Sequence, residues 1–330
     1  MKVLILHSEI DPCAAADEQD VLVQAEAVTR ALRSLGHEAQ TLPFSLDLAG
    51  LADRLKRSAC DLVFNLVETA GGQGRLIHLA PSLLDFLGIP YTGAGTEATF
   101  LSSNKLAAKR FLRARRLRTP DWVSLTESTV RDPFPAGSRF IVKSVWEHAS
   151  VGLEERSVVA PRSLAALREE IRGRLADLGG AAYAERYVEG REFNLSVLAG
   201  IRGPEVLPPA EIDFVGYGDE RLRIVGYRAK WDEKAFEYYH TPRRFDFGPQ
   251  DRALLRSLKR TALRCWDLFG LRGYARVDYR VDAGGSAWIL EINSNPCLSP
   301  DSGFTAATLR AGLPFEEVVS RIIGDTLGTA

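Results

Sequence analysis

Three residues with side-chain oxygens near the C-terminus have the types and spacing to hold one metal ion, with an arginine beside them. Arg276 and Asp278 lie two apart in "YARVDYRV", and Glu291 and Asn293 lie two apart in "AWILEIN". Residues two apart in a strand share a face, and the "DAGGS" between the runs predicts a hairpin turn. If the two polar faces coincide, carboxylate and amide oxygens converge beside one guanidinium, which suits Mg²⁺ carrying substrate phosphates. The simpler interpretation of such a hairpin is a solvated charged face.

Two further stretches could bind a nucleotide. In "FIVKSVWEHASVG" a strand ends at Lys143, and a short loop closes at Gly152, which suits phosphate contacts by an ammonium and backbone N–H groups. In "AYAERYVEGREFNL" Glu192 could hold a ribose, while backbone groups near Arg186 and Val188 could meet an adenine edge. An ordinary hairpin with a surface lysine and a linker between lobes are the plain alternatives.

Several function classes are disfavoured by composition and pattern. The 330 residues carry a net charge of −1, so no basic excess recruits nucleic acid or an anionic membrane, and no apolar run has the length of a membrane span. Four separated cysteines without a C-x-x-C pair indicate reduced thiols and a cytoplasmic protein. The five histidines show no ligand spacing and are expected to be hydrogen-bonded or at the surface. No P-loop pattern occurs, and "GAGTEA" at 93–98 comes too late in its α/β unit for a dinucleotide site.

The elements that must position these residues follow from periodicity. Residues 1 to about 95 alternate short apolar strands with amphipathic helices, including one over 21–36, which predicts an α/β layer on a largely parallel sheet. The order of helical and strand-like runs from about 96 to 188 predicts a compact α+β unit. Residues 189 to 330 hold the hairpin, another strand and two helices, over 250–270 and 314–327. The stretches around 202–209 and 239–249 are rich in Pro, Gly and Arg and predict long loops.

Taken in order, these motifs resemble the ATP-grasp superfamily and, within it, the D-alanine–D-alanine ligase family. The resemblance covers nearly the whole chain, through "GIPYTGAGTEATFLSSNKLAAKRFL", "FIVK", "EHASVG", "ERYVEGREF", "YRAKWDE" and "RVD…LEINSNP". It implies an N-terminal Rossmann-like α/β domain over 1–95, a central ATP-grasp lobe over 96–188, and a C-terminal lobe over 189–330 with the metal and substrate site. The two lobes would sandwich ATP between them.

The resemblance also implies roles for individual residues. Those implied at the nucleotide are Lys105, Lys143, Glu185, Arg186, Val188, Glu192 and Leu290, and those implied as Mg²⁺ ligands are Asp278, Glu291 and Asn293. Those implied in catalysis are Lys230 near the γ-phosphate, Ser150 in the phosphate loop, Arg276 at the reacting carboxyl and Cys297 through its backbone N–H. Two Mg²⁺ ions are expected, and Mn²⁺ is expected to substitute for them.

The positions that would contact the first amino-acid substrate depart from the family pattern. Asp17 or Glu18 is nearest to the family's amine-binding glutamate, and Val67-Glu68 replaces a His-Gly dipeptide. Ala149 replaces a serine, Trp231 a tyrosine and Cys297 a glycine, whereas Ser302 is kept where the family holds a substrate carboxylate.

The sequence therefore predicts an ATP-dependent carboxylate–amine ligase that works through an acyl phosphate. Its substrates would be small and amino-acid-like, and we expect them to differ from a pair of D-alanines. The product could be an amide or an ester, and a homodimer is left open. The alternatives are a genuine D-alanine–D-alanine ligase and, in a different class, a non-catalytic nucleotide-binding regulatory protein.

Overall fold

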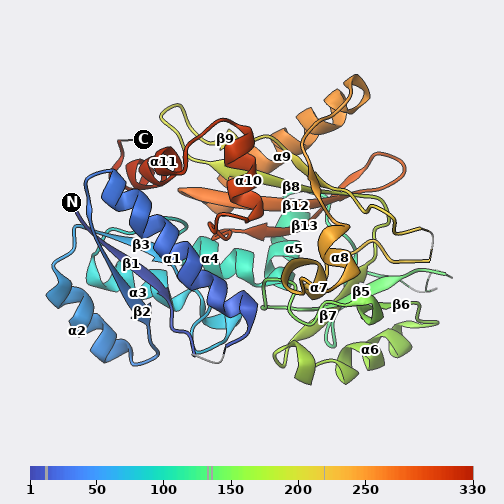
Figure 1. Ribbon diagram of the computed structural model, residues 1–330. Coiled ribbons are helices and arrows are strands. Elements are labelled where there is room, and N and C mark those ends of the chain that lie inside the picture. The colour runs from blue at the N-terminus through green and yellow to red at the C-terminus, as the bar shows by residue number, and fades with distance from the viewer. Residues whose placement is uncertain (12–13, 132–133, 135–136, 219, 330) are drawn as a thin grey trace.

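The computed structural model describes residues 1–11, 14–131, 134, 137–218 and 220–329, and its strands form three sheets (Figure 1). The first is parallel, in the order β2-β1-β3, with β1 (Lys2–Ser8), β2 (Glu38–Phe44) and β3 (Leu62–Leu66). The second is antiparallel, in the order β4-β7-β5-β6, with β4 (Trp122–Val123), β5 (Phe140–Ser144), β6 (Val158–Val159) and β7 (Ala182–Arg186). Together with the helices between the strands, they confirm the α/β class.

The third sheet is antiparallel and has the order β11-β10-β8-β12-β13, with β9 also paired to β8. Its strands are β8 (Arg191–Leu198), β9 (Glu205–Val206), β10 (Ala210–Ile212), β11 (Arg243–Arg244), β12 (Tyr274–Val281) and β13 (Ala287–Asn293). The helices are α1 (Ala16–Ser34), α2 (Leu48–Ser58), α3 (Leu79–Leu87), α4 (Thr96–Ser103), α5 (Lys105–Ala114), α6 (Leu164–Gly173), α7 (Tyr227–Trp231), α8 (Phe236–Tyr239), α9 (Arg252–Phe269), α10 (Gly303–Arg310) and α11 (Phe315–Leu327). Within the part of the chain described, no helix is long and apolar enough to cross a membrane.

The first sheet is buried on both faces, and the run 3–6 of its central strand β1 is apolar and buried. One core joins it to α1, α10 and α11, and another joins it to α2 and α3. Figure 1 shows the red helix α11 close to the blue helix α1. After β3 the chain returns to this sheet at Tyr91, which bridges to Val63, and Gly95 then caps α4. The glycines of "GAGTEA" thus follow the last extended segment of the sheet, which agrees with the dismissal of a dinucleotide motif.

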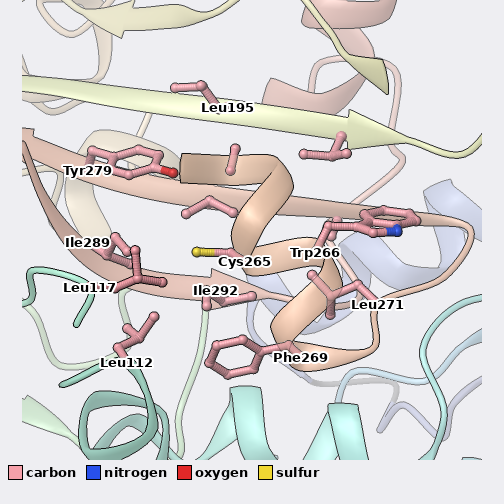
Figure 2. Packing of buried hydrophobic residues seen from close by; sticks show 14 of the residues in the cluster. Leu112, Leu117, Leu195, Cys265, Trp266, Phe269, Leu271, Tyr279, Ile289 and Ile292 are labelled. Carbon is pink, nitrogen blue, oxygen red and sulfur yellow. The ribbon is translucent and has the colours of Figure 1, made fainter. Parts of the chain in front are cut away.

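The third sheet rests on α9, whose apolar residues lie on one helical face. Leu258, Ala262, Cys265, Trp266 and Phe269 are buried and recur at helical spacing. Figure 2 shows several of them packed against β8, β12 and β13, and helices α4 and α5 contribute to the same core. This packing buries one face of the sheet and leaves its other face to carry polar side chains.

Some elements differ from the sequence expectations. Helix α1 begins at Ala16 rather than at 21, and helices α4 and α10 were not predicted. The sequence of α4 is rich in Thr and Ser, which have modest helix propensity. The start of α10 was readable in principle, because the Ser302 side chain accepts from the Thr305 N–H as an N-cap. The predicted loops around 202–209 and 239–249 contain β9 and β11, each only two residues long and so too short to show alternation.

Candidate active site

The polar hairpin predicted from the C-terminal sequence is confirmed. Strands β12 and β13 pair so that Arg276 lies opposite Asn293 and Asp278 lies opposite Glu291. Between them Val277 pairs with Ile292, and both are buried on the opposite face. The pleat therefore sends the polar set to one side of the sheet and the apolar set into the core.

A third strand adds a residue that the sequence reasoning missed. Asn194 of β8 lies opposite Asp278, and its Nδ2 donates to Asp278 Oδ1 at 2.8 Å. Arg276 holds the same carboxylate with two parallel bonds, Nε to Oδ1 and Nη2 to Oδ2, both 2.8 Å. The signal for Asn194 was present in "REFNLSVL", where polar Glu192, Asn194 and Ser196 alternate with apolar residues.

The polar face of this sheet, the second sheet and the segment 147–153 enclose a cavity of about 480 Å³. Every residue that the sequence analysis placed at the nucleotide, the metal, the reacting groups or the substrate lines this cavity, except Asp17 and Glu18. Glu18 lines a neighbouring cavity, which shares Glu68, Glu147 and His148 with the first. The Asp17 side chain lies outside the described part of the structure. The acid that α1 does present to the main cavity is Asp20.

At the end of the cavity formed by β5 and β7, Glu185 is enclosed by two lysines. Its Oε1 is 2.6 Å from Nζ of Lys143, which lines the cavity, and its Oε2 is 2.5 Å from Nζ of the fully buried Lys109. Burial alone would raise the pKa of Glu185, but the charges of Lys109 and Lys143 outweigh burial and lower it. Lys109 was missed because it reads as one more polar position on an amphipathic helix. The Glu185 carboxylate therefore orients Lys143, and Glu192 is held in turn by Arg280 at 2.8 Å.

Three more groups surround the middle of the cavity. Lys105 Nζ donates to the Glu147 backbone carbonyl at 2.6 Å, and no described carboxylate lies within 4.0 Å of Lys230 Nζ. Burial and then Lys105 lower the pKa of His148 to about 3, so its ring is neutral near pH 7. His148 Nε2 is buried without a hydrogen-bond partner, so the expectation of a satisfied or surface histidine is wrong here. Lys105 and Lys230 have no carboxylate partner within 4.0 Å among the described residues, and their charges indicate a site for an anion in this cavity.

The loop over this cavity is held against α7. Ser150 Oγ donates to the Val225 carbonyl at 3.0 Å, and Trp231 Nε1 donates to the Ala149 carbonyl at 3.3 Å. Ala149 and Ser150 both have left-handed backbone conformations, with φ of 55° and 62°, which cost non-glycine residues about 1 kcal/mol each. Such strain is typical of functional loops.

The far end of the cavity is acidic. Asp20 Oδ2 accepts from Cys297 Sγ at 2.9 Å and from Ser299 Oγ at 3.0 Å, and Gln24 Nε2 donates to Glu68 at 2.7 Å. Burial, followed by the charge of Glu68, raises the pKa of the Cys297 thiol, so it is a neutral donor to Asp20 rather than a nucleophile. Ser302 lines the same end as the N-cap of α10.

The residues present fit a magnesium ion that also binds phosphate. Burial alone would raise the pKa of Glu291, but Lys105 and other cations lower it to about 2, so it is ionised. The described residues contain no cluster of three or more His, Cys, Asp or Glu suited to a metal. Asp278, Glu291 and Asn293 supply two carboxylates and one amide, so phosphate oxygens and water would complete the shell, as is usual for Mg²⁺.

Lys143 on the second sheet, with Lys105 at the start of α5 and Lys230 in α7, shares one cavity with the carboxylates of the third sheet, and this arrangement is the one expected of an ATP-grasp enzyme. The family described as "D-ala D-ala ligase C-terminus" matches residues 113–324. The chain is 31% identical to the D-alanine–D-alanine ligase of Synechococcus sp. (strain JA-3-3Ab), over 96% of this chain and 92% of that one. It is likewise 31% identical to the enzyme of that name from Methylococcus capsulatus, over 94% and 92%. The chain belongs to the D-alanine–D-alanine ligase family, and it is an ATP-dependent ligase.

The fold agrees with this membership. The structure of the D-alanine–D-alanine ligase from Bacillus anthracis complexed with ATP superposes with a TM-score of 0.72 at 18% identity, covering 99% of this chain and 97% of that one. The expected ATP-grasp fold is therefore confirmed.

Proposed function

We propose that this ligase activates the carboxylate of an amino-acid-like substrate other than D-alanine and joins it to an amine. The observation that carries this proposal lies at the end of the cavity that would receive the first substrate. Ala149 offers no hydroxyl there, and the Trp231 indole N–H is already engaged by the Ala149 carbonyl. A substrate that forms hydrogen bonds to hydroxyls at these two positions would lose both partners here. Each polar group of the substrate left buried and unpaired would cost roughly 1–3 kcal/mol of binding free energy.

The cations of the cavity would neutralise the phosphates of ATP. Lys105 and Lys143 come from the central segment, and Lys230 faces them from α7. Bound Mg²⁺, held by Asp278, Glu291 and Asn293, would supply further charge neutralisation at the phosphates. We propose two such ions, with Mn²⁺ able to replace them. Glu192 would meet the ribose, and Arg186, Val188, Leu290 and Glu185 would surround the base.

Arg276 is placed to act on the reacting carboxyl group. Two of its nitrogens are bound to Asp278, which fixes the plane of the guanidinium and leaves Nη1 for the substrate. Attack of the carboxylate oxygen on the γ-phosphorus would break its bond to ADP and form an acyl phosphate. The amine would then add to the acyl carbon and lose a proton, and inorganic phosphate would leave as the amide forms. Arg276 and the Cys297 backbone N–H would stabilise the resulting oxyanion. The 147–152 loop, with Ser150, would exclude water from the acyl phosphate.

We further propose that the ranges 1–95, 96–188 and 189–330 act as three functional parts. In support, each of the three sheets lies inside one of these ranges. Ser302, at the N-terminus of α10, would hold the carboxylate of the amine substrate.

A genuine D-alanine–D-alanine ligase is the second candidate, favoured by the names of the relatives. A non-catalytic nucleotide-binding protein is disfavoured because Lys105, Lys143, Asp278, Glu291 and Asn293 all line one cavity. The test is ADP release with ATP, Mg²⁺ and a panel of D- and L-amino acids, dipeptides and hydroxy acids. Highest kcat/KM for D-alanine alone would overturn the proposal, and another preferred acid would support it.

A further inference from the structure

Arg243 is a cation of the cavity to which the reaction described above gives no role. It belongs to the short edge strand β11, where it lies opposite Ile212 of β10. Residues directly opposite in an antiparallel pair share a face, and both Ile212 and Arg243 line the main cavity. The neighbouring Arg244 must then point to the other face of the sheet.

That other face anchors the strand. Arg244 Nη2 is 2.5 Å from Glu211 and its Nε is 3.1 Å from Asp213, while Arg191 Nη2 is 2.6 Å from the same Glu211. Glu211 is buried, and Arg191 also pairs with Asp251. Because β11 is only two residues long, the ion pairs of Arg244 determine which face of the sheet each of its two side chains points to. The network therefore holds Arg243 toward the cavity.

The surroundings of Arg243 leave its charge largely uncompensated. Nη1 donates to the backbone carbonyl of Asp301 at 3.1 Å, and no carboxylate of the described residues lies within 4.0 Å of the guanidinium. The residue is exposed at the rim, but protein atoms surround its guanidinium closely enough that burial, and then the charge of Arg276, lower its pKa. Nε lies 3.3 Å from the position that a Cβ on Gly303 would occupy, so the charge sits against the first residue of α10.

We infer that Arg243 binds an acid group that the amine substrate carries in addition to the carboxylate held at Ser302. This inference rests on the proposed function, in which Arg276 serves the reacting carboxyl, Lys230 the phosphate, and Ser302 one carboxylate. A neutral substrate group packed over Arg243 would cover the guanidinium without supplying an opposite charge, which is costly. A carboxylate would instead accept two charge-assisted hydrogen bonds from it. The substrate class is an amino acid with an acidic side chain.

The test compares isosteric acids and amides as amine substrates. With ATP, Mg²⁺ and the carboxylate donor that the panel ranks first, ADP release is measured for aspartate against asparagine and glutamate against glutamine, in both enantiomers. The wild type should favour an acid over its amide by about tenfold or more in kcat/KM. Arg243→Gln should bring that ratio to about one, through KM for the acid, with KM for ATP unchanged. The control Arg252→Gln, at an exposed position that starts α9 away from the cavity, should keep the preference.

Equal use of acids and amides by the wild type would overturn the inference and leave the proposed function intact. An Arg243→Gln variant that slows acids and amides alike would also overturn it. Arg243 would then bind the carboxylate that every amine substrate carries, together with Ser302, and not an additional acid group. Absence of ADP release with every compound would contradict the proposed function itself. In that case the affinity of the Mg·ADP-loaded protein for glutarate, measured by calorimetry, decides the role of Arg243. A loss of about tenfold in Arg243→Gln supports the acid site, and an unchanged affinity refutes it.

Discussion

Asp278 and Glu291 lie directly opposite each other on neighbouring strands, yet only Asp278 is held by the protein. Arg276 and Asn194 bind the Asp278 carboxylate, whereas the contacts of the described residues include no hydrogen bond or ion pair to the Glu291 side chain. The pair thus combines a carboxylate with a fixed orientation and one that is open to a ligand. This asymmetry separates the effects expected from changing each residue.

Glu291→Gln should abolish turnover and weaken Mg²⁺ binding by at least about tenfold, because it removes one charge from the metal site without breaking a protein contact. The thermal midpoint of the free protein should stay within a few degrees of wild type. Asp278→Asn should also lose turnover, but with a loss of about 2 kcal/mol in stability, since the partly buried Arg276 loses its ionic partner. Magnesium titration and denaturant unfolding check both variants, and normal turnover in Glu291→Gln would refute the metal assignment.

Lys143→Ala should raise the dissociation constant for ATP by about tenfold or more, about 1.4 kcal/mol, because it removes a charge-assisted phosphate contact. Lys109→Met is the matched control: this lysine binds the same Glu185 but is fully buried and does not line the cavity. It should reduce stability with a much smaller change in nucleotide affinity. Calorimetry with ATP analogues measures both, and equal losses of affinity in the two variants would contradict the assignment of Lys143.

Acid should destabilise the protein partly through Glu185. Its pKa lies below the ordinary 4.5 because Lys109 and Lys143 outweigh the effect of burial. A carboxyl whose pKa is lowered by folding stabilises the fold above its unfolded-state pKa, and this contribution is lost as pH falls through the folded-state pKa. We expect the free energy of unfolding of wild type to decrease below pH 4.5 more steeply than that of the double variant Glu185→Gln/Lys109→Met. Parallel pH profiles from denaturant unfolding would count against this role.

How far the sequence predicts this site depends on whether a residue's role is local. The hairpin was predictable because Arg276, Asp278, Glu291 and Asn293 alternate with apolar residues within two adjacent strands. A phosphate-binding role was predictable for Lys143 because it lies near the end of a strand that leads into a loop. The roles proposed for them in binding ATP and Mg²⁺ rest on a family resemblance rather than on periodicity.

The residues that were missed depend on contacts between distant segments. Asp20 acts at the cavity only because α1 packs near residues 297–299, and Glu18, two positions earlier, faces a neighbouring cavity. The burial of the Lys109 charge is compensated by the Glu185 carboxylate, which is 76 positions away in sequence but 2.5 Å away in space. Arg243 lies in a stretch that looked like a loop, and its direction follows from the ion pairs of Arg244. Such placements come from tertiary packing, which local patterns do not encode.

Restoring the missing hydroxyls should shift the enzyme toward D-alanine. In Ala149→Ser/Trp231→Tyr the two side chains regain polar groups at the end of the cavity that would receive the first substrate. We expect kcat/KM for D-alanine to rise about tenfold, while KM for ATP changes little. A rise in ATP affinity with unchanged use of D-alanine would mean that these positions act on the phosphate loop and not on the substrate.

The central claim is that a substrate carboxylate oxygen attacks the γ-phosphate of ATP. It is tested most directly by labelling both oxygens of the preferred carboxylate substrate with ¹⁸O and analysing the released phosphate by mass spectrometry. The account predicts ADP, one ¹⁸O atom in each phosphate released, and one amide formed per phosphate. Unlabelled phosphate, or AMP and pyrophosphate in place of ADP and phosphate, would contradict it.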